Sequence, residues 1–210
     1  MPPLVGGLIL ANIAAFLLAQ APGSSFVEWF ALWPLNTGLF APWQLLTYAF
    51  LHGNVMHLAF NMWGLWLFGA ELERVWGARR VGFLYTVSVL TAAAAQLLVS
   101  SVTGGVVPTI GASGGLFGLL IGFAMMFPRR TIVLLIPPIP MPAWLFVTVY
   151  GLIELTLGVT GSASGVAHFA HLGGLLGGWM VMRYWRGQPP FGGRRHKSRK
   201  PGTDENRLEF

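Results

Sequence analysis

Residues 111–127 read Gly-Ala-Ser-Gly-Gly-Leu-Phe-Gly-Leu-Leu-Ile-Gly-Phe-Ala-Met-Met-Phe, so a serine ringed by glycines opens an apolar segment. The segment is long enough to enter a lipid bilayer. Ser113 is therefore either a small residue that lets helices pack or a nucleophile at the mouth of a membrane helix. The choice depends on whether other polar side chains in apolar segments are its partners.

The whole chain has the composition of an integral membrane protein. Of its 210 residues, 54% are hydrophobic and only 10% are charged, and the mean hydropathy is +0.63, whereas soluble domains carry about 25% charged residues. A membrane helix needs roughly 17 to 25 apolar residues. We therefore expect an all-α membrane protein with six transmembrane helices, at about 4–20, 55–72, 82–101, 113–127, 142–158 and 165–184.

The first and simplest exclusions concern processing and cysteine chemistry. Segment 4–20 lacks a basic flank and a clear cleavage site, so we expect a retained helix rather than a signal peptide. The chain has no cysteine, which excludes disulfides, thiol catalysis and thiolate metal ligands.

The net charge of +6 predicts membrane topology rather than nucleic-acid binding. The loops at about 21–43, 102–112 and 159–164 contain no Lys or Arg. By the positive-inside rule these loops lie outside and both termini lie in the cytoplasm. Residues 186–210 form a basic tail that we expect to be disordered. Five arginines follow the second and fourth segments, Arg74, Arg79, Arg80, Arg129 and Arg130, and the remaining basic residues lie in or after the end of the sixth.

Glycines four residues apart predict that segments 113–127 and 165–184 are a tightly packed pair. Gly114 and Gly118 lie in the first, and Gly174 and Gly178 lie in the second. Packing through these glycines brings the outer ends together, so that Ser113 and His171 reach hydrogen-bond distance. A neutral imidazole can then take the serine proton and later return it to a leaving amine.

No carboxylate is expected beside His171. Glu28 lies in a loop, Glu71 and Glu73 lie at the cytoplasmic end, and Glu154 lies in segment 142–158 with no evident reason to meet the histidine. The sequence therefore predicts a serine–histidine dyad. Phe117 lies one helical turn beyond Ser113 on the same face, where we expect it to stack on His171.

Segment 55–72 supplies candidate hydrogen-bond donors, because His57 and Asn61 are four residues apart and share a helix face. With the free backbone N–H groups around Ser113 they can stabilise a tetrahedral oxyanion, at about 3–4 kcal/mol per donor. The small residues Gly111, Ala112 and Gly114 would let a substrate backbone approach the serine.

Structural readings of the same residues remain open. The Gly-x-Ser-Gly run can be packing alone, and His57 with Asn61 can be an interhelical hydrogen-bond pair. His168 and His171 are three apart on one face and could bind zinc, but there is no His-Glu-x-x-His motif. We expect neither a metal nor a cofactor.

The ordered motifs resemble the rhomboid family of intramembrane serine proteases over residues 1–185. They are His57-x-x-x-Asn61, Gly111-Ala-Ser-Gly and Ala170-His-Leu-Gly-Gly174. The resemblance implies a six-helix bundle with Ser113 as nucleophile, His171 as general base, and His57, Asn61 and the Ser113 backbone as the oxyanion hole. It implies hydrolysis through an acyl-enzyme, without a cofactor, in a multi-pass protein of a bacterial inner membrane. Its substrates would be single-span membrane proteins cut near the outer face, not nucleic acids.

The resemblance also implies that the aromatic loop 21–43 lies partly in the outer leaflet and that segment 142–158, with the loop after it, forms a lateral gate. Glu73 resembles the family acid that holds the second helix. Many members carry Trp-Arg in the first loop where this chain has Trp43-Gln44, which puts the anchoring of that loop in question. The roles of His52, His168 and Glu154 are left open. The rival hypothesis is a non-catalytic rhomboid-like protein that binds membrane helices.

Overall fold

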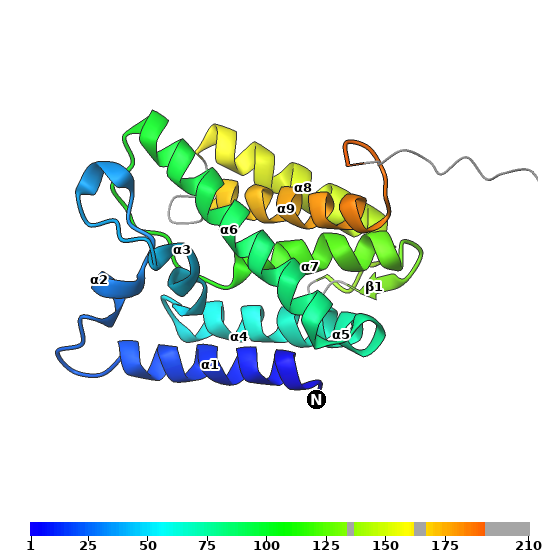
Figure 1. Ribbon diagram of the computed structural model, residues 1–210, viewed down its shortest axis with the longest axis horizontal. Helices are drawn as coiled ribbons and strands as arrows, with labels where there is room; N and C mark the ends of the chain where they lie inside the picture. The colour runs from blue at the N-terminus through cyan, green and yellow to red at the C-terminus, as the bar shows by residue number, and fades with distance from the viewer. Residues whose placement is uncertain (134–136, 162–166, 192–210) are drawn as a thin grey trace, which may run out of the picture.

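The computed structural model describes residues 1–133, 137–161 and 167–191, and most of them are helical (Figure 1). The predicted mostly helical fold is confirmed. The tail beyond residue 191, with His196, lies outside the described residues. The long helices are α1 (Pro3–Ala19), α4 (Val55–Gly64) continued by α5 (Ala70–Trp76), α6 (Ala78–Thr103), α7 (Ser113–Met126), α8 (Ala143–Thr160) and α9 (His168–Trp185).

Short elements connect these helices. The first loop contains α2 (Phe26–Phe30), the 3₁₀ turn η1 (Leu35–Thr37), α3 (Gln44–Thr47) and the 3₁₀ turn η2 (Tyr48–Phe50). A two-stranded antiparallel pair, β1 (Thr131–Val133) with β2 (Pro140–Pro142), joins α7 to α8. The sequence reasoning did not anticipate this hairpin, because its strands are only three residues long.

The second predicted segment is longer and less regular than expected. Between α4 and α5 the chain forms a π-helical turn, η3 (Leu65–Gly69), and the helix continues to Trp76. Glycines stand at both edges of this turn, where their lack of a side chain admits neighbours. A Cβ on Gly64 would lie 2.7 Å from Leu116 Cδ2, and one on Gly69 would lie 3.0 Å from Val5 Cγ2. The glycines at this turn thus allow the second segment to pack closely against α7 and α1.

Two helices in the described part of the chain, α6 and α8, are long and apolar enough to cross a membrane by length and composition. Helices α1 and α7 are apolar but shorter. The count of six membrane spans therefore stays a prediction, although helices occupy all six expected ranges.

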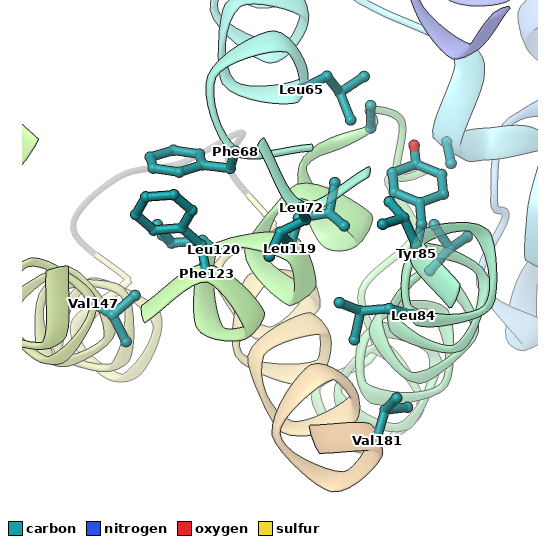
Figure 2. Close-up of a cluster of buried hydrophobic side chains, with 14 of the residues drawn as sticks. Leu65, Phe68, Leu72, Leu84, Tyr85, Leu119, Leu120, Phe123, Val147 and Val181 are labelled. Carbon is teal, nitrogen blue, oxygen red and sulfur yellow. The ribbon is translucent and has the colours of Figure 1, made fainter. Parts of the chain in front are cut away.

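Helix α7 lies at the centre of the buried core. Figure 2 shows Leu119, Leu120 and Phe123 of α7 facing side chains from the neighbouring helices. Phe68 packs edge-on against Phe123, with ring centroids 5.3 Å apart. Burial of this apolar cluster fixes the position of α7. The neighbours labelled in Figure 2 are Leu65, Phe68 and Leu72 of the second segment, Leu84 and Tyr85 of α6, Val147 of α8 and Val181 of α9.

The predicted close packing of α7 and α9 through glycines is confirmed. A Cβ on Gly174 would collide with the Gly114 carbonyl, and one on Gly178 would lie 2.6 Å from Ile121 Cγ2 and 2.7 Å from Gly118 Cα. The two backbones therefore approach each other directly. Gly177, one residue earlier in the helix, instead makes room for Thr91 of α6. Helix α9 thus uses two glycine faces, one for each neighbour.

The arginine-rich ends of the helices lie together at one end of the bundle. Arg130, just after α7, pairs with Glu71 of α5 at 3.3 Å. Arg186, at the end of α9, donates to the Met125 carbonyl at 2.6 Å. This common end agrees with the topology that the charge distribution predicts. In Figure 1, α2 and α3 lie at the opposite end from α5 and β1.

Candidate active site

Ser113 is the first residue of α7, and the loop before it is held by backbone hydrogen bonds to the first loop. Leu32 and Thr109 exchange two such bonds, at 3.0 and 2.9 Å, and the Gly111 N–H donates to the Tyr48 carbonyl at 3.0 Å. The first hydrogen bond of α7 runs from the Leu116 N–H to the Ala112 carbonyl. The N–H groups of the first turn come before that bond. Such groups at a helix N-terminus have no acceptor within the helix, so they can donate to an anionic ligand.

His171 meets Ser113 across the α7–α9 contact. Its Nε2 lies 2.8 Å from the Ser113 Oγ, a hydrogen-bond distance. His171 lies in the first turn of α9 and its side chain is 12% exposed, so the ring is sheltered but open enough for water to approach. The arrangement suits proton transfer from the hydroxyl to the imidazole.

Phe117 stacks on the imidazole of His171, as its helical phase predicted. Its ring also stacks on Tyr150 of α8, with centroids 5.4 Å apart, and Tyr150 in turn stacks on Phe146. A column of aromatic rings therefore runs from the histidine along α8. The column restricts the imidazole to one plane.

The expectation that no carboxylate reaches His171 is wrong. Glu154 Oε2 lies 2.9 Å from His171 Nδ1 and 2.7 Å from His168 Nδ1. The contact with His168 has hydrogen-bond geometry, whereas the contact with His171 is short enough for an ion pair but does not meet that geometry. Glu154 is 5% exposed. One signal for this pairing was in the sequence, because a carboxylate inside an apolar helix needs a partner.

The space beside Gly111 links His57 to the serine. A Cβ on Gly111 would lie 2.8 Å from His57 Nε2 and 3.6 Å from Ser113 Oγ, so both groups border the same space. The φ angle of Gly111 is +127°, which side-chain-bearing residues rarely adopt. Glycine is required here by both space and backbone conformation.

Asn61 and the small residues next to the serine have mainly structural contacts. The Asn61 side-chain amide donates to the His57 carbonyl at 3.0 Å, which leaves one of its two N–H groups for another acceptor. Ala112 is fully buried, and a Cβ on Gly114 would lie 2.5 Å from Ala92 Cβ. The smallness of Gly114 is thus explained by packing against α6 rather than by access of a substrate.

Gln44 anchors the first loop, although the chain lacks the arginine that many members of the family carry at this position. Its side chain is buried and lies within the first loop. The amide nitrogen donates to the Leu39 carbonyl at 3.1 Å and to the Trp29 carbonyl at 3.4 Å, and its oxygen accepts from the Trp33 N–H at 3.2 Å. The neutral amide of Gln44 therefore stabilises the loop through three hydrogen bonds to its backbone.

His52 lies behind His57 and is 2% exposed. The two rings meet edge to face, with centroids 4.9 Å apart. Neither ring nitrogen of His52 makes a hydrogen bond of good geometry within the described residues. Burial, with a smaller contribution from the nearby His57, lowers the pKa of His52 from 6.5 to about 4. His52 is thus a neutral packing partner for His57 at pH 7.

One cluster offers metal-ligating atoms. Glu154, His168 and His171 place three ligand atoms within 4.8 Å of one another. These atoms already pair among themselves, since one carboxylate oxygen contacts both imidazoles. The cluster therefore has a chemical explanation that needs no ion.

The fold and the site together define a helical membrane protein that presents a serine–histidine pair at the head of its central helix. A model of the Rhomboid domain matches residues 40–187. The chain belongs to the rhomboid family, whose members are integral to membranes.

Known relatives come from several lineages. The chain is 30% identical over 194 residues to Rhomboid protein 1, mitochondrial, of Saccharomyces cerevisiae, covering 86% of this chain and 54% of that protein. It is 30% identical over 141 residues to Rhomboid protease GluP of Bacillus subtilis, covering 66% and 25%. It is 27% identical over 195 residues to Rhomboid protease GlpG of Serratia proteamaculans, covering 87% and 62%. The chain thus spans less than two thirds of the length of each of these relatives.

Proposed function

We propose that this protein is an intramembrane serine endopeptidase. The observation that carries the proposal is the 2.8 Å contact between Ser113 Oγ and His171 Nε2. Two relatives named as rhomboid proteases support it. Because the pair lies at the end of the bundle opposite the arginines, cleavage takes place near the outer face of the membrane.

The reaction follows from the positions of the donors and acceptors. Ser113 Oγ attacks the scissile carbonyl carbon while its proton passes to His171 Nε2. The resulting oxyanion accepts hydrogen bonds from the Ser113 N–H and from His57, with Asn61 as a further donor. The imidazolium then gives its proton to the leaving amine, and an acyl-enzyme remains. Water, activated by the same imidazole, hydrolyses the ester and restores the serine.

The substrates we propose are single-span membrane proteins that approach within the bilayer. Most exposed side chains of α8 are apolar, and the exposed threonine hydroxyls donate to carbonyls of their own helix, as expected for a surface that faces lipid or another membrane helix. We propose a bacterial inner membrane as the location, with both termini in the cytoplasm. The mitochondrial relative belongs to a different membrane, so location is to be tested separately. The exposed residues include Trp144, Val149, Leu152, Ile153, Leu155 and Val159.

A direct test uses the purified protein in detergent with a single-span model substrate. We expect cleavage by the wild type and a loss of at least roughly a thousandfold in Ser113→Ala and His171→Ala. A fluorophosphonate probe should label the wild type but not Ser113→Ala. Cleavage that persists unchanged in both variants would exclude this chemistry.

The same experiment separates the proposal from its rivals. A non-catalytic membrane-helix-binding protein would retain the substrate without cutting it and would not react with the probe. Metal-dependent hydrolysis would be lost on adding a chelator and would survive Ser113→Ala. We expect neither behaviour.

A further inference from the structure

Helix α8 carries a carboxylate that its apolar surroundings do not explain. In α8 only Ala143, Val147 and Glu154 are buried. The first two are small apolar residues that pack against the core. Glu154 is the only acidic or basic residue in the helix, and it faces α9 rather than lipid. Burying a carboxylate is costly unless it is paired, so its partners indicate its role.

Both partners of Glu154 are histidines of α9, and both use Nδ1. A single oxygen, Oε2, lies 2.7 Å from His168 Nδ1 and 2.9 Å from His171 Nδ1. His168 is 6% exposed, so the carboxylate is enclosed on that side. The hydrogen bond from His168 holds the carboxylate at the Nδ1 edge of the His171 ring, across the ring from the Nε2 edge that meets Ser113.

The choice of ring nitrogen matters for the proton transfer. His171 can accept the serine proton at Nε2 only if its own hydrogen is on Nδ1. An acceptor beside Nδ1 favours that tautomer. When Nε2 takes the proton, the ring becomes a cation, and a nearby carboxylate offsets the new charge.

We propose that Glu154 is a positioning residue for His171, held in place by His168, so that the working unit is Ser113–His171–Glu154 rather than a dyad. The inference rests on the proposed hydrolytic function. It assigns a role to both residues that sequence reasoning left open. Glu154 touches no substrate and acts only through His171.

The test compares Glu154→Gln, Glu154→Asp and a control in the same helix, Thr156→Ala. Thr156 is exposed and its hydroxyl donates to the Leu152 carbonyl of its own helix, so loss of the hydroxyl should leave activity unchanged. We expect Glu154→Gln to lower kcat and the rate of fluorophosphonate labelling by roughly 10- to 100-fold, with KM changed less than about twofold. Glu154→Asp, which keeps the charge, should recover part of the rate.

A second measurement does not depend on the Glu154 variants folding. In wild-type protein labelled with ¹⁵N-histidine, the His171 signal, identified by its loss in His171→Ala, should show the Nδ1–H tautomer at neutral pH. A dominant Nε2–H tautomer, or full kcat in a folded Glu154→Gln protein, would overturn the inference. Such a result would leave the proposed function standing if Ser113→Ala is still inactive. Activity that persists in Ser113→Ala would overturn both the proposed function and the inference about Glu154.

Discussion

Phe117 and His171 lie with their ring planes 9° apart and their centroids 4.4 Å apart. The stack joins the helix that carries the serine to the helix that carries the base. An aromatic pair of this kind contributes about 0.5–1.5 kcal/mol beyond its buried area.

We therefore expect Phe117→Leu to lower kcat by about 2- to 10-fold by loosening the imidazole. Phe123→Leu is the matched control, because Phe123 is a buried phenylalanine of the same helix that packs on Phe68 and not on the histidine. Cleavage of a model substrate and the melting temperature of both variants should be measured. Equal losses of activity in the two variants would show that Phe117 acts through general stability.

Gly111→Ala should abolish cleavage almost completely. The added Cβ would meet His57 Nε2 at 2.8 Å, and the φ of +127° strains any side-chain-bearing residue. Gly105→Ala, in the same connection between α6 and α7, is the control, because its Cβ would only reach ordinary contact with Ser100 at 3.7 Å. Activity of the Gly105 variant should stay within about twofold of wild type. An active Gly111→Ala protein would contradict the crowded geometry.

Glu73 should contribute strongly to stability, since its carboxylate accepts hydrogen bonds from the N–H groups of Leu4 and Val5, at 2.9 and 2.8 Å. These are orphan donors at the start of α1, so the carboxylate caps one helix from another. Hydrogen bonds to a charged group are worth about 1.5–3 kcal/mol each, so Glu73→Gln should lower the free energy of unfolding by about 2–3 kcal/mol.

The control for Glu73 is Glu71→Gln, two residues away. Within the part of the chain that the structure describes, Glu71 pairs with Arg74 and Arg130 at the surface. Such pairs contribute about 0–1 kcal/mol. Thermal unfolding in detergent should separate the two variants. Similar melting temperatures would contradict the capping role.

His52 should make stability depend on pH between about 4 and 6.5. Its pKa is lowered from 6.5 to about 4 in the folded protein, so in this window the unfolded chain binds the extra proton and the folded chain does not. Stability therefore rises with pH across the window and falls on acidification. His52→Phe removes the titrating group but keeps a ring beside His57.

The free energy of unfolding of the wild type and of His52→Phe should be measured at pH 7 and at pH 4.5. We expect the wild type to lose more of its unfolding free energy on acidification than His52→Phe does. The difference between the two proteins isolates His52 from other titrating groups. An equal or larger loss of unfolding free energy in His52→Phe would contradict the predicted direction of the pH dependence.

Several parts of the fold and the site could be predicted because they depend on local patterns. The apolar runs predicted the helix ranges to within about four residues, and the largest differences are that the second segment continues to Trp76 and that α6 begins at Ala78, among arginines that the hydropathy pattern had placed outside it. The spacing of Gly114, Gly118, Gly174 and Gly178 predicted the α7–α9 contact, and so the approach of Ser113 and His171. The division of the chain at residue 185 into a membrane domain and a tail stays a prediction.

Other parts depend on tertiary contacts that no local pattern specifies. Glu154 meets His171 because of how α8 leans on α9, and its position in an apolar helix indicated only that a partner was needed. The π turn at Leu65–Gly69 follows Gly64, which fits closely against Leu116 of α7, a tertiary contact that the local sequence does not specify. Gln44 braces the first loop through backbone carbonyls, which residue type alone does not reveal.

Helix α8 buries few residues, yet it holds the carboxylate behind the base. In the arrangement we propose, a displacement of α8 would therefore carry Glu154 away from His171. Opening the bundle on this side would be coupled to loss of the carboxylate behind the base.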